Sequence, residues 1–171
     1  MACDTALTLR LAWLAGIVDG EGSIGMYIST KLDKVSGKRV RKQLIGFANI
    51  TNCDARLIKE ASTILTAYGV KHRLQYMKPR GNRKACWYIQ INSLKAVLSF
   101  LDFVTPFLVS KKERAELVQA MIRHRRSTMD KRETFGPRIS AWEDEWLMRQ
   151  LAFLQETNRQ KPRHELTKFG A

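Results

Sequence analysis

Two carboxylates separated by one glycine stand at the end of an apolar run. Residues 14–22 read LAGIVDGEG, and the two acids are Asp19 and Glu21. If the run is helical, both acids lie near its C-terminus, which carries about half a negative charge. An acid at that end destabilises a helix by about 0.3–1 kcal/mol. We therefore expect a positively charged group next to these two side chains.

The residues before the acids have the pattern of an amphipathic helix. Large apolar residues recur at helical spacing: Leu7, Leu11, Leu14 and Val18. Small residues on another face would allow a second helix to approach closely: Ala12, Ala15, Gly16 and Gly20. Gly20 and Gly22 break the helix, and a strand pattern starts at Ser23. Glu21 is thus predicted at a helix–strand junction.

Alternating side chains predict a first hairpin after this helix. Polar or aromatic residues alternate with aliphatic ones over residues 23–31, as in a strand with one solvent-facing side. Residues 34–38 contain Ser36-Gly37 and are typical of a turn. The alternation resumes over residues 39–50 and carries several basic side chains. The predicted hairpin therefore has a basic, polar face.

The rest of the chain repeats this order. Asp54 is a candidate cap for a helix that ends at Gly69, and a second hairpin turns at residues 79–82. A helix from Ser93 stops at Pro106, and further helices follow, one of them starting with a capping box of Ser110 and Glu113.

This order predicts an α+β fold. Its core is α-β-β-α-β-β-α, with a four-stranded antiparallel saddle sheet, helices on one face and an extra C-terminal helix. We expect residues 1–157 to form a single domain and residues 158–171 to form a basic, flexible tail.

The composition favours an anionic partner. The 171 residues include 30 Lys and Arg against 16 Asp and Glu, a net charge of +14. Nucleic acid is the leading candidate, and we expect no membrane partner because no long basic amphipathic helix or lipidation signal occurs. Three cysteines and three histidines lack metal-ligand spacing, which disfavours a zinc site. We expect an intracellular location, in the cytoplasm or an organelle.

Residues 14–22 resemble the defining motif of the LAGLIDADG homing endonucleases, and the order of elements over residues 7–125 matches the core of that family. Members with one motif form homodimers through paired motif helices, and this chain has one motif. The resemblance therefore implies a homodimer. Its interface is predicted to include Leu14, Ala15 and Gly16.

The resemblance also implies a metal-dependent site. Glu21 takes the place of the metal-binding acid, with the backbone carbonyl of Gly20 as a further ligand and Asp19 in a supporting role. Mg²⁺ or Mn²⁺ is the expected cofactor. The family has Asp at the second acid, so the longer Glu21 side chain departs from the pattern.

Three further positions match catalytic positions of the family. Asn52 falls where relatives place a water-positioning group, Arg56 follows at the expected interval, and Lys111 falls near the scissile phosphate. Each has an ordinary alternative. Asn52 could cap a helix, Arg56 could be solvated, and Lys111 could belong only to a capping box.

The sheet is predicted to bind DNA, since a two-stranded ribbon fits the major groove and about ten strand residues span about ten base pairs. For any one residue on that face, a solvated surface is the alternative to base contact. Ile45 and Phe47 are the better indicators because exposed apolar groups need a reason. The candidates are Tyr27, Ser29, Lys31, Arg39, Arg41, Gln43, Ile45, Phe47, Asn49, Arg73, Gln75, Tyr88 and Gln90.

The resemblance thus implies a site-specific endonuclease of the intron-encoded type. It would cut both strands of a long pseudo-palindromic DNA target and leave short 3′ overhangs. Two alternatives use the same fold. One is an intron maturase that binds its intron RNA, and the other is a cleavage-inactive DNA-binding regulator.

Overall fold

A computed structural model describes residues 2–32, 39–82, 84–127 and 141–159. The predicted α+β fold and the order of its elements are confirmed. The elements are α1 (Ala2–Glu21), β1 (Gly22–Leu32), β2 (Arg39–Asn52), α2 (Ala55–Ala67), β3 (Arg73–Met77), β4 (Cys86–Ile91), α3 (Leu94–Val104), the 3-10 turn η1 (Thr105–Phe107), α4 (Lys112–Ser127) and α5 (Ala141–Arg159).

The chain divides into two compact units, residues 1–138 and residues 139–171. The second unit contains α5, which is the extra C-terminal helix expected from the sequence. The prediction of one domain over residues 1–157 stays a prediction, and residues 160–171 of the predicted tail lie outside the described residues. Among the described helices, none has an apolar stretch long enough to cross a membrane.

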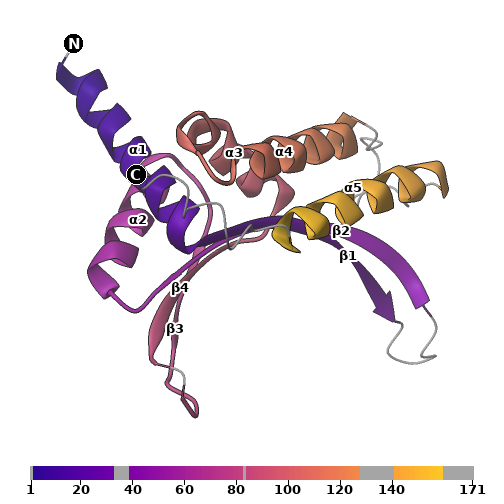
Figure 1. The fold of residues 1–171 in the computed structure, drawn as a ribbon, viewed down its shortest axis with the longest axis horizontal. Coiled ribbons are helices and arrows are strands. Elements are labelled where there is room, and N and C mark those ends of the chain that lie inside the picture. The colour runs from indigo at the N-terminus through magenta and orange to yellow at the C-terminus, as the bar shows by residue number, and fades with distance from the viewer. Residues whose placement is uncertain (1, 33–38, 83, 128–140, 160–171) are drawn as a thin grey trace, which may run out of the picture. The chain divides into compact units, whose positions relative to one another are not determined.

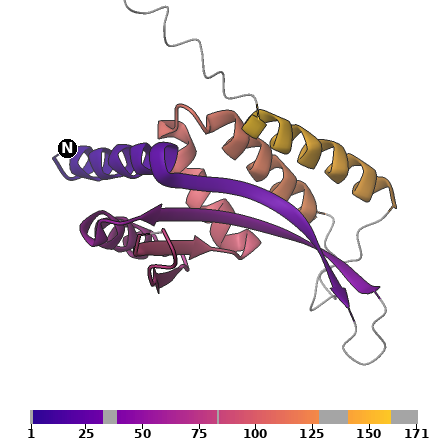
Figure 2. The ribbon, with the colours of Figure 1, turned by 60° about the horizontal axis from the view of Figure 1, so that its bottom comes forward.

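The first unit is built on one antiparallel sheet with the order β1-β2-β4-β3. The β1–β2 pairing runs from Gly22 opposite Ile50 to Leu32 opposite Arg39, with an irregularity after Lys31. Figures 1 and 2 show the strands curving as an arch with α3 and α4 on its outer side. The inner side of the arch has no helix of this unit across it (Figure 1).

The core lies between the outer side of the sheet and the helices. Alternate strand residues are buried there, as the sequence pattern predicts, among them Ile24, Ala48, Ile50, Ile89 and Ile91. The apolar stripe of α2 is buried against them through Ile58, Ala61, Ile64 and Leu65. Since one side of β1, β2 and β4 is committed to the core, the other side of these strands is free for function.

The step from α1 to β1 takes no loop at all. A side chain at Gly22 would place its Cβ 2.5 Å from the Val18 carbonyl oxygen, closer than atoms tolerate. Only glycine therefore lets the strand start directly after the helix. This places Glu21, the last residue of α1, at the predicted helix–strand junction.

Candidate active site and nucleic-acid interface

Asp19 joins the end of α1 to the start of α4. Its carboxylate accepts hydrogen bonds from the backbone N–H of Val109 at 2.7 Å, the Ser110 hydroxyl at 3.0 Å and the Lys111 N–H at 3.0 Å. Desolvation raises the pKa of Asp19, but the bonds from Val109, Ser110 and Lys111 outweigh it and hold the pKa below its ordinary value. Asp19 thus faces the positive end of α4, which offsets its poor position at the negative end of α1.

The start of α4 therefore differs from the sequence prediction. A local capping box of Ser110 and Glu113 was expected, but the Ser110 hydroxyl donates to Asp19 and the cap comes from another helix. A carboxylate carried to the helix start by tertiary packing is a stronger acceptor than a neutral hydroxyl. The interaction spans about ninety residues of sequence, beyond what a local pattern can indicate.

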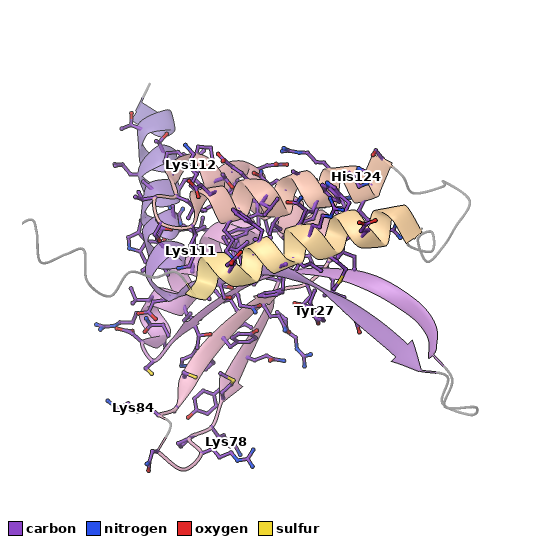
Figure 3. All side chains as sticks on the ribbon, turned by 45° about the vertical axis from the view of Figure 1, so that its right-hand side comes forward. Tyr27, Lys78, Lys84, Lys111, Lys112 and His124 are labelled. Atoms are coloured by element: carbon purple, nitrogen blue, oxygen red, sulfur yellow. The ribbon has the colours of Figure 1, made fainter. Side chains whose placement is uncertain are left out.

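Lys111 is the positively charged group that was expected near the end of α1. Its ammonium donates to the Val18 carbonyl at 3.0 Å and also to the Asp19 carbonyl. These carbonyls belong to the last turn of α1, where no following turn satisfies them. Lys111 is labelled in Figure 3. The structure therefore brings Lys111 to the last turn of α1 and to Asp19, the first acid of the motif.

Glu21 offers an exposed carboxylate at the same place. Among the residues that the structure describes, none forms a hydrogen bond or ion pair with it. Gly20 beside it is also exposed. Their oxygens are the donors that Mg²⁺ prefers, so these two residues fit a magnesium site.

One copy of the described chain supplies an incomplete set of ligands for that site. Within the described ranges, no group of three or more His, Cys, Asp or Glu residues could hold a metal ion. A cation at Glu21 would need further oxygen ligands from outside these residues.

Asn52 and Arg56 lie together at the start of α2. Asn52 Oδ1 accepts from the Asp54 N–H at 2.7 Å, and Asp54 caps the helix through the Arg56 N–H at 2.8 Å. The Arg56 guanidinium also donates to Asp54, with Nη2 at 2.7 Å. The Arg56 bonds lower the pKa of Asp54 to about 2, and Asp54 raises the pKa of Arg56. Both residues thus have local structural partners here, and their catalytic roles stay predictions.

Arg114 is a neighbour of the site that sequence reasoning missed. Its Nε donates to the Ile24 carbonyl of β1, and burial of the half-buried guanidinium lowers its pKa. The available signal was its position one helical turn after Lys111 on α4.

The predicted DNA-binding side chains share one face of the sheet. Directly opposite residues of antiparallel strands point to the same side. The register pairs Tyr27 with Ile45, Asn49 with Gln90, and Gln90 in turn with Arg73. The strand alternation places the other described residues of the predicted set on the same face, which are Ser29, Phe47, Gln75 and Tyr88. The side chains of Lys31, Arg39, Arg41 and Gln43 lie outside the described residues, although their backbones belong to β1 and β2.

A shallow depression of about 430 Å³ lies on this face, lined by Tyr27, Ile45, Phe47, Asn49, Gln90 and Asn92. The rings of Tyr27 and Phe47 are 6.0 Å apart between centroids and tilted by 52°. Tyr27, labelled in Figure 3, is 48% exposed. The buried Asn49 Oδ1 has no hydrogen-bond partner in the described part of the chain. The depression thus offers both apolar contact and a hydrogen-bonding group.

Tyr88 adds a donor to the same face. Burial raises the pKa of its hydroxyl, with the hydrogen bond to Gln90 acting in the opposite direction and Tyr27 adding to the rise. The hydroxyl therefore keeps its proton at neutral pH and can donate a hydrogen bond.

The predicted dimer interface needs correction. Leu14 and Ala15 are fully buried within the protomer, with 0% exposure, so they have no surface to present to a second copy. Only Gly16 of the predicted set is exposed. The exposed face of α1 runs instead through Leu9, Ala12, Gly16 and Gly20. Leu14, Ala15 and Val18 of the motif helix face the core, whereas Gly16 and Gly20 lie outside.

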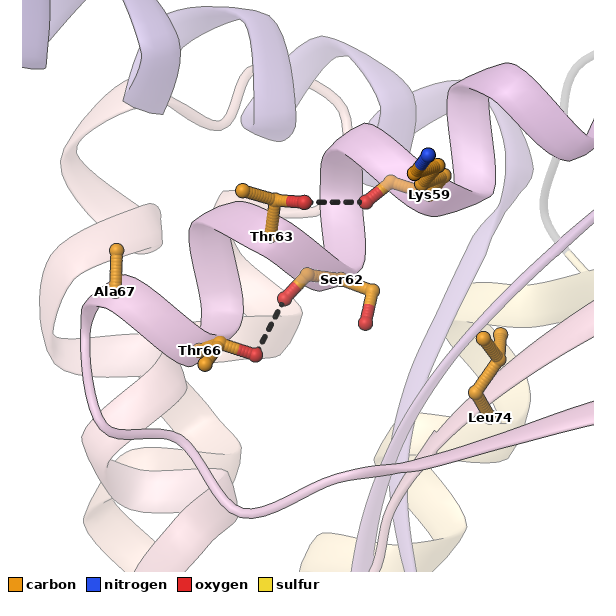
Figure 4. Close-up of a pocket in the computed structure, with 6 residues that line it drawn as sticks. All are labelled: Lys59, Ser62, Thr63, Thr66, Ala67 and Leu74. Atoms are coloured by element: carbon orange, nitrogen blue, oxygen red, sulfur yellow. Dashed lines mark hydrogen bonds between the residues drawn. The ribbon is translucent and has the colours of Figure 1, made fainter.

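A second hollow lies away from the site, between α2 and β3 (Figure 4). It has a volume of about 420 Å³ and is lined by Lys59, Ser62, Thr63, Thr66, Ala67 and Leu74. Thr63 and Thr66 donate to carbonyls of their own helix. Ser62 Oγ lies 2.7 Å from His72 Nε2, and the other ring nitrogen of His72 donates to the Val70 carbonyl. These hydroxyls serve local structure.

Comparison with known proteins identifies similar folds. A family model described as a LAGLIDADG-like domain matches residues 8–105. The homing endonuclease I-CvuI, solved with uncleaved target DNA in the presence of Mg, has a TM-score of 0.64 and 17% identity, covering 92% of this chain and 87% of that chain. The archaeal intron-encoded homing endonuclease I-Vdi141I, solved with DNA, has a TM-score of 0.64 and 13% identity, covering 87% and 84%.

A longer chain contains a similar fold as well. The LAGLIDADG homing endonuclease I-GzeII, solved with its DNA target, has a TM-score of 0.56 and 15% identity, covering 85% of this chain but 43% of that chain. No curated protein matches the sequence. At these identities, the solved structures establish a shared fold.

Proposed function

The chain belongs to the LAGLIDADG family, and from this premise we propose that it is a Mg²⁺-dependent endonuclease that cuts both strands of DNA as a homodimer. The observation that carries the proposal is Glu21, an exposed carboxylate without a described partner at the helix–strand junction. Lys111 reaches the same junction from α4.

The inner side of the sheet supports DNA binding. It combines aromatic, amide and basic side chains on one concave surface, and the chain has a net charge of +14. A basic surface draws a polyanion, while amides and arginines address base edges in the major groove. The similar structures of I-CvuI and I-Vdi141I were solved with DNA. We propose double-stranded DNA as the partner of this face.

Glu21 and the Gly20 carbonyl would hold the cation, Mg²⁺ or Mn²⁺. Such a cation, when bound, polarises the phosphate, lowers the pKa of water and stabilises the leaving oxygen. Glu21 would contribute a negative charge that neutralises part of the cation charge and would fix the position of the cation. Asp19 would support the site by holding the start of α4 against the end of α1, which keeps Lys111 at the last turn of α1.

The cationic and amide side chains complete the proposed chemistry. The Lys111 ammonium would offset negative charge that develops on the phosphate. Asn52 and Arg56 would order the water around the reacting phosphate, as the family resemblance implies. Arg56 is 91% exposed, so its guanidinium can leave Asp54 for a DNA phosphate without loss of core packing.

The exposed glycines of α1 support the homodimer. A Cβ at Gly16 or Gly20 would meet no atom of the protomer within 4 Å. Each glycine nevertheless weakens a helix by about 0.5–1 kcal/mol relative to alanine. Close approach of a second copy accounts for small residues there, and two copies would bring two Glu21 carboxylates together. The fold also fills 43% of the longer I-GzeII chain, which leaves room there for a second unit.

The finer features follow from the two-fold symmetry. A symmetric dimer reads a pseudo-palindromic target, and we propose cutting that leaves short 3′ overhangs by an intron-encoded type of enzyme. Intron RNA is the partner under the maturase alternative. The regulator alternative keeps the DNA face but has no need of an exposed acid at the junction.

The direct test is cleavage of a randomised duplex library in Mg²⁺, read by sequencing the cut ends. We expect the wild type to enrich a pseudo-palindromic site and Glu21→Gln to leave it uncut. Glu21→Gln should still bind that site in Ca²⁺, because the sheet is unchanged. Glu116→Gln, an exposed acid on α4, is the matched control. Binding of a defined duplex without cleavage by the wild type would favour the regulator.

A further inference from the structure

We propose that Arg114 is a positioning residue that holds the Glu21 junction in place for cation binding. The inference rests on the proposed function, because it assigns Glu21 to the cation. It concerns a helix residue that lies outside the motif and outside the DNA-binding strands.

Two cations at the start of α4 bind the backbone on either side of Glu21; Lys111 directly precedes the helix and Arg114 lies in its first turn. The Lys111 ammonium binds the carbonyls of Val18 and Asp19, on the helix side of the junction. The Arg114 guanidinium binds the carbonyl of Ile24, on the strand side. Because Lys111 and Arg114 are one helical turn apart, a single rigid helix fixes the backbone before and after Glu21.

The strand side needs such an anchor. β1 is an edge strand of the sheet, paired with β2 on one side only. Since Gly22 lets the chain enter the strand without a loop, rotation at this glycine would move Glu21. A charged donor on the nearby Ile24 carbonyl makes a stronger bond than a neutral one and limits that rotation.

The surroundings of Arg114 favour its guanidinium over other donors. Arg114 Nη2 lies 3.3 Å from the position that a Cβ on Gly25 would take, and Phe47 Cζ lies 2.8 Å from the same point. Gly25 therefore leaves room for both groups at the edge of the DNA-binding face. A planar guanidinium fits this narrow space and keeps Nε aimed at the carbonyl, whereas a lysine ammonium has no such fixed direction.

The test compares Arg114→Lys and Arg114→Met with Arg123→Met. Arg123 lies on the same helix and pairs with Asp102 at 2.5 Å, so it controls for loss of a cationic contact elsewhere on α4. The first readout is hydrogen exchange of the backbone amides of residues 20–24 in the full chain without metal or DNA. We expect a loss of protection in both Arg114 variants and none in Arg123→Met.

The second readout compares two quantities for each variant: the single-turnover cleavage rate in Mg²⁺ and the DNA affinity in Ca²⁺. Groups that orient metal ligands change activity by about 10–100-fold, so we expect that loss in Arg114→Met with unchanged DNA affinity. We expect Arg114→Lys to recover part of the rate. Unchanged exchange at residues 20–24 would overturn the inference, as would DNA affinity that falls as far as the cleavage rate. If the wild type cuts no duplex, the proposed function fails. The hydrogen-exchange result alone then decides whether Arg114 holds the backbone around Glu21.

Discussion

The starts of α2 and α4 are both capped by an aspartate, but the two aspartates come from different distances. Asp54 immediately precedes α2 and bonds to the N–H of Arg56, two residues on. Asp19 lies about ninety residues before α4 and reaches it through the fold. The local cap, Asp54, stabilises the start of one helix. The distant cap, Asp19, joins the end of α1 to the start of α4, and these two segments form the candidate site.

The difference shows how a poor position for a charge becomes useful. Asp19 is unfavourable at the end of α1 considered alone, and Asp54 is favourable where it stands. The α1 end accepts Asp19 because the start of α4 and the Lys111 ammonium are packed against it. The same packing brings the Lys111 ammonium to the last turn of α1, the helix that ends at Glu21. The junction therefore depends on tertiary structure in a way that the α2 start does not.

We expect the largest effect from replacing Lys111, because this removes the ammonium that binds the carbonyls at the end of α1. Lys111→Met should lower the single-turnover cleavage rate by about 100–1,000-fold, the range for removal of one donor that stabilises developing charge. DNA affinity in Ca²⁺ should stay near the wild-type value, since the sheet is intact.

The matched control for that change is the adjacent Lys112→Met. Lys112 is exposed at the first turn of α4 (Figure 3). Its loss should leave the cleavage rate near the wild-type value. Equal losses in the two variants would mean that cleavage depends on the general charge of α4, with no special part for the contact with α1.

The next effect compares the two caps through stability. Asp19→Ala removes the acceptor of Val109, Ser110 and Lys111 and should destabilise the fold by about 2 kcal/mol, the upper end of the range for a helix cap. That corresponds to a decrease in Tm of about 4–8 °C for a chain of this size. Differential scanning calorimetry measures it.

Asp54→Ala should lower the Tm less, because water can reach the exposed start of α2. Hydrogen exchange would distinguish the two variants by which backbone amides lose protection. Asp19→Ala should lose protection at the ends of both α1 and α4, and Asp54→Ala only in the first turn of α2. A larger decrease in Tm for Asp54→Ala would reverse the comparison.

These two caps also mark how far the sequence can predict the structure. Asp54, the apolar stripe of α2 and Gly69 are neighbours along the chain, so their pattern predicts the helix and both its ends. The strand alternation likewise predicts which side of the sheet is buried, as Ile24 and Ile89 confirm. Secondary structure can be predicted from sequence where the interacting residues lie within one or two helical turns of each other.

The candidate site could be predicted only in part, because its partners lie far apart in the sequence. The motif indicates Asp19 and Glu21, but the source of the cap of α4 depends on how two distant helices pack. The sequence has small residues on more than one side of α1, and only the packing decides that Ala15 is inside and Gly16 is outside. Arg114 carries no motif at all, since its contact is with a backbone carbonyl.

The smallest expected effect is the response of the local cap to acid. The pKa of Asp54 is lowered from 3.8 to about 2 in the fold, so its contribution to stability is complete above pH 3.8. It is lost as the pH falls through about 2, where the folded-state carboxyl takes up a proton. Asp54→Asn keeps a capping group but cannot titrate, which makes it the matched variant.

Urea unfolding at a series of pH values would measure this response. The stability difference between wild type and Asp54→Asn should be constant above about pH 4 and shrink toward pH 2. A difference that grows on acidification would contradict the assignment. The pKa of Asp19 is also lowered, and Asp19→Asn provides the corresponding series for the distant cap.

The open space around Gly16 and Gly20 has a practical consequence for engineering. Since neither position has protomer atoms within 4 Å of an added Cβ, a larger side chain there meets no atom of its own copy and would act on the proposed self-association. Two differently substituted versions of the chain, one enlarged and one unchanged, could therefore be made to prefer each other. Such a mixed pair would join unlike halves and could address DNA sites whose two half-sites differ in sequence.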